Sequence, residues 1–236
     1  MEILGIIPAR GGSESIPLKN IMPIHGKPLI AYTIQSALKS KINRLIVSTD
    51  NKKIGKISEN LGAEVPFFRP KKISTSSSRT QEAIAHTLNF VKKTEKYVPD
   101  IVILLQPTSP HRTTEMINKS INLLKHSQAS SVISVMKAKK HPTQSFVLKN
   151  GFLKPSNIYH EKKYYQRQLI PDLYYATGAI YTFWTKTFTK YNSIYGHKPK
   201  SLIIKDDELN VDIDTKFDVF VSEMIFQHWS DFKKSS

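Results

Sequence analysis

A basic, glycine-containing loop near the N-terminus carries the side chains best suited to hold a phosphate chain. It follows an apolar run over residues 3–7 that predicts a buried strand. Gly11 and Gly12 allow a backbone approach that a Cβ would block, and successive N–H groups there could form an anion-binding concavity. Arg10 offers a planar fork for phosphate oxygens, and Lys19 offers a compact point charge. The alternative is a surface turn with solvated cations. The pattern is neither a Walker A loop nor Gly-x-Gly-x-x-Gly.

Two carboxylates near the C-terminus could complement this loop by holding a divalent cation. Asp212 and Asp214 are two residues apart, so in an extended segment their side chains would point to the same face. Two converging carboxylates suit a hard cation such as Mg²⁺, with Mn²⁺ as a substitute, and such an ion could bridge nucleotide phosphates. The alternative leaves Asp212 on the surface and makes Asp214 the N-cap of the last helix.

A third polar stretch follows the apolar run over residues 101–105. Ligands of open α/β sheets gather at the carboxyl ends of strands. We therefore expect Gln106, Thr108 and Ser109 at the site, where their neutral donors and acceptors suit sugar hydroxyls. The alternative is a loop stiffened by proline that caps a helix starting at Thr113.

The elements that must position these residues alternate between strand and helix. Strands are predicted over residues 3–7, 44–48, 65–68, 101–105, 131–135, 178–183 and 201–204, and helices over 28–40, 54–61, 80–96, 113–125 and 215–232. This rhythm predicts an α/β fold with a mostly parallel central sheet and helices on both faces. Residues 141–175 break the rhythm with aromatics and prolines, and Asn150-Gly151 predicts a hairpin turn there. We expect a single domain over 1–236 with a small protruding lobe at about 140–176.

The composition bounds the class of protein. The chain has 236 residues, of which 39% are apolar, which is enough for one large domain. It has no cysteine, so disulfides and thiolate metal sites are excluded. Without an apolar run long enough for a signal peptide or membrane span, we expect a cytoplasmic protein with no membrane partner.

The formal net charge of +16 raises the possibility of a nucleic-acid partner, but the lysine pairs are scattered along the chain. That distribution favours a solvated basic surface. The eight histidines show no metal-binding spacing, so they receive no role.

The full string of the N-terminal loop is more specific than its parts. Residues 7–20, Ile-Pro-Ala-Arg-Gly-Gly-Ser-Glu-Ser-Ile-Pro-Leu-Lys-Asn, resemble the N-terminal signature of the CMP-sialic acid synthetases (acylneuraminate cytidylyltransferases). Glu14 and Ser15 stand where that family has Lys and Gly. The resemblance implies that the loop binds the nucleotide through Ala9, Arg10, Gly11, Gly12, Ser13, Lys19 and Asn20.

Further segments resemble the same family in the same order. Residues 104–112 match its second signature, and residues 212–215 resemble its late metal-binding motif. Arg69, in an Arg-Pro pair, would help to recognise the nucleotide, unless it is only a surface charge. A family Asp that follows this pair is replaced here, within residues 74–78, by Ser76.

Two elements near the predicted lobe would serve the sugar. Residues 166–171 resemble an Arg-Gln-x-x-Pro element whose Arg, here Arg167, can approach the sugar acid in the neighbouring subunit's site. Residues 176–181 resemble an Asn-Gly-Ala-Ile-Tyr element, with Thr177 in place of Asn and Tyr181 facing the sugar.

The resemblance implies a Rossmann-like nucleotide-diphospho-sugar transferase that forms a homodimer. It would transfer CMP from CTP to the anomeric hydroxyl of a nine-carbon 2-keto sugar acid, such as N-acetylneuraminate or legionaminate, and release pyrophosphate. Arg10 and Lys19 would hold the triphosphate, and Asp214, with Asp212, would hold Mg²⁺. The alternatives are a cytidylyltransferase for pseudaminate or 3-deoxy-manno-octulosonate and, from another class, a basic nucleic-acid-binding protein. The loop Gly11-Gly12-Ser13 favours the sialic type over the octulosonate type.

Overall fold

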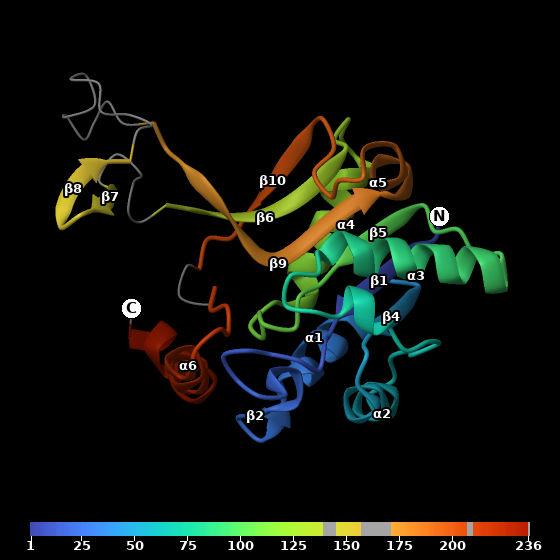
Figure 1. The fold of residues 1–236 in the computed structure, drawn as a ribbon, viewed down its shortest axis with the longest axis horizontal. Helices are drawn as coiled ribbons and strands as arrows, with labels where there is room; N and C mark the ends of the chain where they lie inside the picture. Colours follow the sequence, from blue (N-terminus) through green and yellow to red (C-terminus); the bar gives the residue numbers. More distant parts are fainter. Residues whose placement is uncertain (139–144, 157–170, 207–209, 236) are drawn as a thin grey trace.

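A six-stranded sheet in the order β10-β6-β9-β5-β1-β4 forms the centre of the computed structural model (Figure 1). The structure describes residues 1–138, 145–156, 171–206 and 210–235. The strands are β1 (Ile3–Pro8), β4 (Arg44–Ser48), β5 (Ile101–Leu104), β6 (Ser131–Lys137), β9 (Tyr174–Trp184) and β10 (Pro199–Ile203). Only β9 runs antiparallel to its neighbours β5 and β6, whereas the other three pairings are parallel. The predicted mostly parallel sheet is confirmed.

Helices cover both faces of this sheet because the side chains of its buried strands alternate between two apolar layers. Ile3 and Ile7 of β1 pack in one layer with α1 (Leu29–Leu38), α2 (Lys52–Asn60) and α4 (Thr114–Lys125). Leu4 and Ile6 pack in the other layer with α3 (Thr80–Glu95) and α5 (Thr185–Tyr191). The prediction of helices on both faces is therefore confirmed.

One predicted strand was wrong, and one short helix was missed. Residues 65–68 form no strand, and only isolated bridges join Glu64 to Ile46 and Phe68 to Thr49. Pro66 explains the interruption, because it has no N–H to donate to a ladder. Helix α5 was not expected, since its sequence Thr-Lys-Thr-Phe-Thr-Lys-Tyr lacks an apolar stripe and buries only Thr187 and Phe188.

A hairpin of β7 (Phe146–Lys149) and β8 (Phe152–Pro155) projects beyond the ends of β6 and β9 (Figure 1). Asn150 and Gly151 at its turn both have positive φ, 50° and 80°, as a two-residue hairpin of this kind requires. The predicted turn is thus confirmed. The remainder of the expected lobe includes 139–144 and 157–170, which lie outside the described residues.

The last helix, α6 (Lys216–Ser235), closes the fold near the small hairpin of β2 (Pro23–Ile24) and β3 (Lys27–Pro28). The Phe226 ring packs against Tyr32 and His111, with centroid separations of 4.4 and 4.3 Å. Ser222, which is fully buried, shares a 2.9 Å hydrogen bond with His111 Nε2. These contacts place the start of α6 beside the loop that follows β5. Among the helices described, none is long and apolar enough to cross a membrane.

Candidate active site

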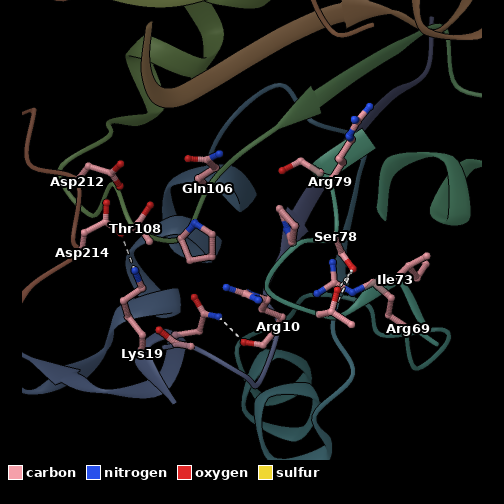
Figure 2. A pocket seen from close by; sticks show the side chains of 16 residues that line it. Arg10, Lys19, Arg69, Ile73, Ser78, Arg79, Gln106, Thr108, Asp212 and Asp214 are labelled. Carbon is pink, nitrogen blue, oxygen red and sulfur yellow. Dashed lines mark hydrogen bonds and ion pairs between the residues drawn. The ribbon is translucent and has the colours of Figure 1, made fainter. Parts of the chain in front are cut away.

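A pocket of about 370 Å³ opens at the carboxyl ends of β1 and β5 (Figure 2). The chain runs from β1 to β4 on one side and later returns to β5 on the other, so this edge is where the strand order reverses. Four segments distant in sequence form its walls. The lining residues are Pro8, Arg10, Ser13, Lys19, Asn20, Arg69, Ile73, Thr75, Ser78, Arg79, Thr80, Gln106, Pro107, Thr108, Asp212 and Asp214.

The carboxylates of this pocket are confined to one end, whereas cationic side chains occur along its whole length. In Figure 2, Lys19, Asp212 and Asp214 lie at one end, and Arg69 and the neighbouring 73–78 segment lie at the other. Arg10 lies between the two ends. A ligand that spans the pocket would therefore meet cations along its length and carboxylates at one end only.

The basic loop is held in shape from both of its ends. Asn20, which is buried, donates from Nδ2 to the Arg10 carbonyl at 2.9 Å. The Gly11 N–H donates to Asp50 Oδ1 at 2.8 Å, and a Cβ on Gly11 would lie 2.9 Å from the Asn51 side chain. The glycine is therefore needed for packing against Asn51, and its N–H is already engaged in this structure.

The two other small residues of the loop differ in their surroundings. Ala9 is fully buried, and its N–H donates to the Ser48 carbonyl, so its side chain belongs to the core. Gly12 faces open space on the side where a Cβ would project. Of the seven loop residues predicted to bind the nucleotide, the structure thus places Arg10, Ser13, Lys19 and Asn20 in the pocket wall.

The basic loop and the acidic segment meet directly. Lys19 Nζ donates to the Ile213 carbonyl at 2.7 Å and to Asp214 Oδ1 at 2.9 Å. The Ile213 N–H in turn donates to the Thr108 carbonyl at 2.8 Å, and the Ile213 side chain is fully buried. The segment that carries both carboxylates is therefore fastened to the loops after β1 and β5.

A capping box at the start of α6 leaves Asp214 available to the pocket. Asp218 Oδ2 accepts from the Thr215 N–H at 2.6 Å, and the Asp218 N–H donates to Thr215 Oγ1 at 3.3 Å. Thr215 and Asp218 thereby satisfy the first N–H groups of the helix reciprocally. The alternative in which Asp214 is the N-cap is wrong.

Asp212 lies in the acidic corner near Gln106 and Gly178. Desolvation by the pocket wall raises the pKa of its carboxyl, and the Asp214 charge adds to this, while a hydrogen bond from Thr108 and the Lys19 charge oppose it. Gly178 has a φ of +79°, and a Cβ there would lie 2.8 Å from Gln106 Oε1. The glycine of the 176–181 element thus makes room for the Gln106 side chain.

A buried arginine positions the loop after β5. Arg112 donates from Nη1 to the carbonyls of Gln106 and Ala179, at 3.0 and 2.8 Å, and from Nη2 to Thr33 Oγ1 at 2.5 Å. Burial lowers the pKa of its guanidinium to about 9. Thr113 caps α4 by accepting from the Met116 N–H at 3.2 Å, as the alternative reading of this stretch expected. The loop therefore both caps a helix and presents Gln106 and Thr108 to the pocket.

Arg69 is a pocket residue and not the surface charge of the alternative interpretation. It is only 7% exposed, and its Nε donates to Ser74 Oγ at 3.1 Å. Burial lowers the pKa of its guanidinium, Asp50 raises it, and the nearby Arg10 lowers it further. This end of the pocket is consequently rich in positive charge.

Sequence reasoning missed most of the segment that follows Arg69. Ile73, Thr75, Ser78 and Arg79 all line the pocket. The available signal was the run of hydroxyl side chains between an Arg-Pro pair and the start of α3. Such a run offers several donors and acceptors next to a buried cation.

Three predicted sugar contacts lie behind the pocket wall. Ser109 is buried and does not line the pocket. Thr177 shares a 2.7 Å hydrogen bond with Ser134 inside the sheet. Tyr181 is buried edge-on against Tyr195, and burial raises the pKa of its phenol to about 12. A direct sugar contact for Thr177 or Tyr181 would require these arrangements to change. Arg167 lies outside the described residues.

The acidic corner has the chemistry of a magnesium site that is completed by its substrate. No group of three or more His, Asp or Glu side chains suited to a metal occurs among the residues that the structure describes. Mg²⁺ is commonly bound through one or two carboxylates together with substrate phosphates and waters. Asp212 and Asp214 therefore fit an ion that arrives with a nucleotide.

A mostly parallel sheet with a basic loop and two carboxylates at the edge where its strand order reverses defines a nucleotide-binding α/β protein. More narrowly, the chain belongs to the cytidylyltransferase family, whose model matches residues 4–222.

Three relatives are similar over nearly the whole chain. The CMP-N,N'-diacetyllegionaminic acid synthase of Legionella pneumophila is 32% identical, over 96% of this chain and 97% of that protein. The pseudaminic acid cytidylyltransferase of Campylobacter jejuni is 31% identical, over 96% and 97%. The N-acylneuraminate cytidylyltransferase of Escherichia coli is 32% identical, over 92% of this chain and 50% of that longer protein.

A solved structure confirms the fold. CMP:2-keto-3-deoxy-manno-octonic acid synthetase, solved in complex with CTP, superposes with a TM-score of 0.69 over 97% of this chain and 100% of its own. The sequence identity is 15%, so this similarity concerns the fold alone.

Proposed function

We propose that this protein transfers CMP from CTP to the anomeric hydroxyl of a nine-carbon 2-keto sugar acid and releases pyrophosphate. The observation that carries the proposal is the convergence of Arg10, Lys19 and Arg69 with Asp212 and Asp214 on one pocket. The names of the legionaminic and N-acylneuraminate relatives support the choice of sugar acid.

The pocket suggests an orientation for CTP. The triphosphate would extend from Arg10 toward Lys19 and the two carboxylates, and the nucleoside would lie toward Arg69 and the 73–78 segment. Bidentate Arg contacts and hydroxyl donors suit the polar edges of a nucleotide. The sugar acid would then approach past Gln106 and Thr108.

The reaction is an attack of the anomeric hydroxyl on the α-phosphorus with departure of pyrophosphate. The chain's contribution would be positioning and charge stabilisation, which dominate displacements at phosphorus. Lys19 would stabilise the negative charge that develops as pyrophosphate departs, and Arg10 would fix the phosphates. Mg²⁺ or Mn²⁺ held by Asp214 and Asp212 would neutralise phosphate charge.

A homodimer would complete the site. The hairpin of β7 and β8 exposes five large apolar side chains, Phe146, Val147, Leu148, Phe152 and Leu153. Large apolar side chains exposed on a projecting hairpin are typical of an interface, and a two-fold pairing would cover them with their own copies. In this arrangement Arg167 would act in the partner's site. A cytoplasmic location accords with these substrates.

The decisive experiment is a pyrophosphate-release assay with CTP and a panel of acids. The panel contains N-acetylneuraminate, legionaminate, pseudaminate and 3-deoxy-manno-octulosonate. We expect pyrophosphate to be released with N-acetylneuraminate or legionaminate, and we expect the release to depend on Mg²⁺. Pseudaminate is the second candidate, because a relative of nearly equal identity is named for it. Salt-sensitive nucleic-acid binding, with no release of pyrophosphate from CTP in the presence of any of the four acids, would overturn the proposal.

A further inference from the structure

The ammonium group of Lys19 contacts Asp214, one of the two carboxylates that fit a metal ion, and the carbonyl of the neighbouring Ile213. Its two acceptors, the Ile213 carbonyl at 2.7 Å and Asp214 Oδ1 at 2.9 Å, are both oxygens. Carbonyl and carboxylate oxygens are also the ligands of hard divalent cations. The ammonium thus compensates the Asp214 carboxylate in the nucleotide-free protein.

The two partners of this ion pair differ strongly in their access to solvent. The Lys19 side chain is 12% exposed, whereas the Asp214 side chain is 69% exposed. An entering cation can therefore reach Asp214 from the pocket, while the lysine stem stays packed. The Lys19 charge would stay compensated when this ion pair breaks, because the phosphates would replace Asp214 as its partner.

We infer that Lys19 is the resident cation of the acidic corner in the nucleotide-free protein, and that it leaves Asp214 when a divalent ion enters together with the triphosphate. This inference rests on the proposed function. A divalent ion and an ammonium would repel each other around the same carboxylate, so the bare ion binds weakly while Lys19 is present. The phosphates would supply negative charge for both cations. Metal and nucleotide binding are therefore coupled, each favouring the other.

For the reaction, this exchange means that Lys19 would change partners in a fixed order. Lys19 would compensate the Asp214 carboxylate before CTP binds, and would turn to the phosphates once Asp214 holds the divalent ion. The ammonium would thus reach the leaving group only when the metal is in place. A pocket without nucleotide would hold little metal.

Titration of Mn²⁺ in the absence of nucleotide, followed by the electron paramagnetic resonance of the free ion, tests this exchange. Lys19→Met should bind one Mn²⁺ at least about tenfold more tightly than the wild type, because its ammonium no longer competes for Asp214. Arg10→Met removes the same charge from the same pocket and is the matched control, with an expected gain below about threefold. The double variant Lys19→Met, Asp214→Asn should lose the gain.

Two outcomes would overturn the inference. One is a Lys19→Met affinity within about twofold of the wild type, and the other is a gain that persists in the double variant. Lys19→Gln repeats the test if Lys19→Met does not fold. The wild type provides an independent measurement through the NMR signal of its Lys19 ammonium. We expect that signal to be unmoved by millimolar Mg²⁺ alone and to shift when CTP is added with it, and a shift with Mg²⁺ alone would contradict the exchange.

The ion titration contains neither CTP nor a sugar acid, so its result is separate from that of the turnover assay. Pyrophosphate release together with unchanged Mn²⁺ affinity in Lys19→Met would reject the exchange and leave the proposed function standing. Tighter Mn²⁺ binding with no turnover on any acid would reject the proposed substrate and leave the exchange standing.

Discussion

Arg112 donates from Nη1 to the Ala179 carbonyl at 2.8 Å and so joins the loop after β5 to the antiparallel strand β9. The same nitrogen holds the Gln106 carbonyl at 3.0 Å. The pocket residue Gln106 is consequently positioned by an arginine that does not itself line the pocket. The Arg at the end of the Leu-Gln-Pro-Thr-Ser-Pro-x-Arg string has a structural role here.

Replacing Arg112 should therefore cost stability as well as activity. Arg112→Leu removes the donors of three hydrogen bonds, two of them buried, and we expect a loss of about 3 kcal/mol in the free energy of unfolding. Urea denaturation followed by circular dichroism measures the change. Lys119→Met, on the exposed face of α4, should change the free energy by less than about 0.5 kcal/mol. An Arg112→Leu protein as stable as the wild type would contradict the positioning role.

Substitutions of Asp214 and Asp218 should affect different properties: the first should affect turnover, and the second the stability of the fold. Asp214→Ala is expected to abolish turnover in Mg²⁺ while the protein stays folded, because the carboxylate is exposed and would hold the ion that neutralises the phosphate charge. Asp212→Ala should be strongly impaired as well. Asp218→Ala breaks the capping box and should lower the free energy of unfolding by about 1 kcal/mol, with a much smaller effect on turnover. Steady-state kinetics and thermal unfolding measure both effects, and near-normal activity of a folded Asp214→Ala protein would reject its assignment to the metal.

Lys19→Ala should reduce the catalytic rate by roughly 10²–10³, which is the scale of one lost electrostatic contact to a developing negative charge. The Michaelis constants for CTP and for the sugar acid are measured in the same experiment. A higher Michaelis constant for CTP with an unchanged kcat would make Lys19 a binding residue and remove its catalytic role.

His111 should make the fold sensitive to mild acid. Burial lowers the pKa of its imidazole from 6.5 to about 4, so in the folded state the ring stays neutral while the unfolded chain takes up a proton. The neutral ring therefore contributes to the free energy of unfolding above pH 6.5, and this contribution is lost as the pH falls toward 4. Between pH 7.5 and 5 the free energy of unfolding should decrease by about 2 kcal/mol. We expect His111→Gln to lose less stability over that interval than the wild type. His126→Gln, which alters an exposed histidine, should retain the full loss. Urea titrations at the two pH values provide the comparison.

The exposed hairpin should hold the two subunits together. Leu148→Ser with Leu153→Ser is expected to shift the protein from dimer to monomer in sedimentation velocity, since both side chains are at least 65% exposed in the single chain.

Mixing the inactive proteins Arg167→Ala and Asp214→Ala tests whether the sites are shared. If Arg167 acts in the partner's site, free exchange should restore about a quarter of wild-type activity by the symmetry of the dimer. Demonstrated exchange without recovery would remove Arg167 from that position.

The sequence alone determined the parts of this protein that depend on local periodicity and on contiguous motifs. Unbroken apolar runs predicted β1 and β5, because strands buried on both faces require apolar residues at every position. The Asn150-Gly151 turn was predictable because positive φ at two successive positions favours these residue types. The basic loop and the Asp212-Asp214 pair were recognised as candidate ligands from their residue types and spacing.

Only the tertiary structure decided which of these residues meet. Lys19 and Asp214 are 195 positions apart, and no local pattern records that the start of α6 docks beside the loop after β1. Three features of the site depend on the strand order. They are the burial of Arg69, the positions of Ser78 and Arg79 in the pocket wall, and the hydrogen bond between Thr177 and Ser134 inside the sheet. That order arises from the packing of many elements at once, whereas a motif reports only the chemistry of its own few residues.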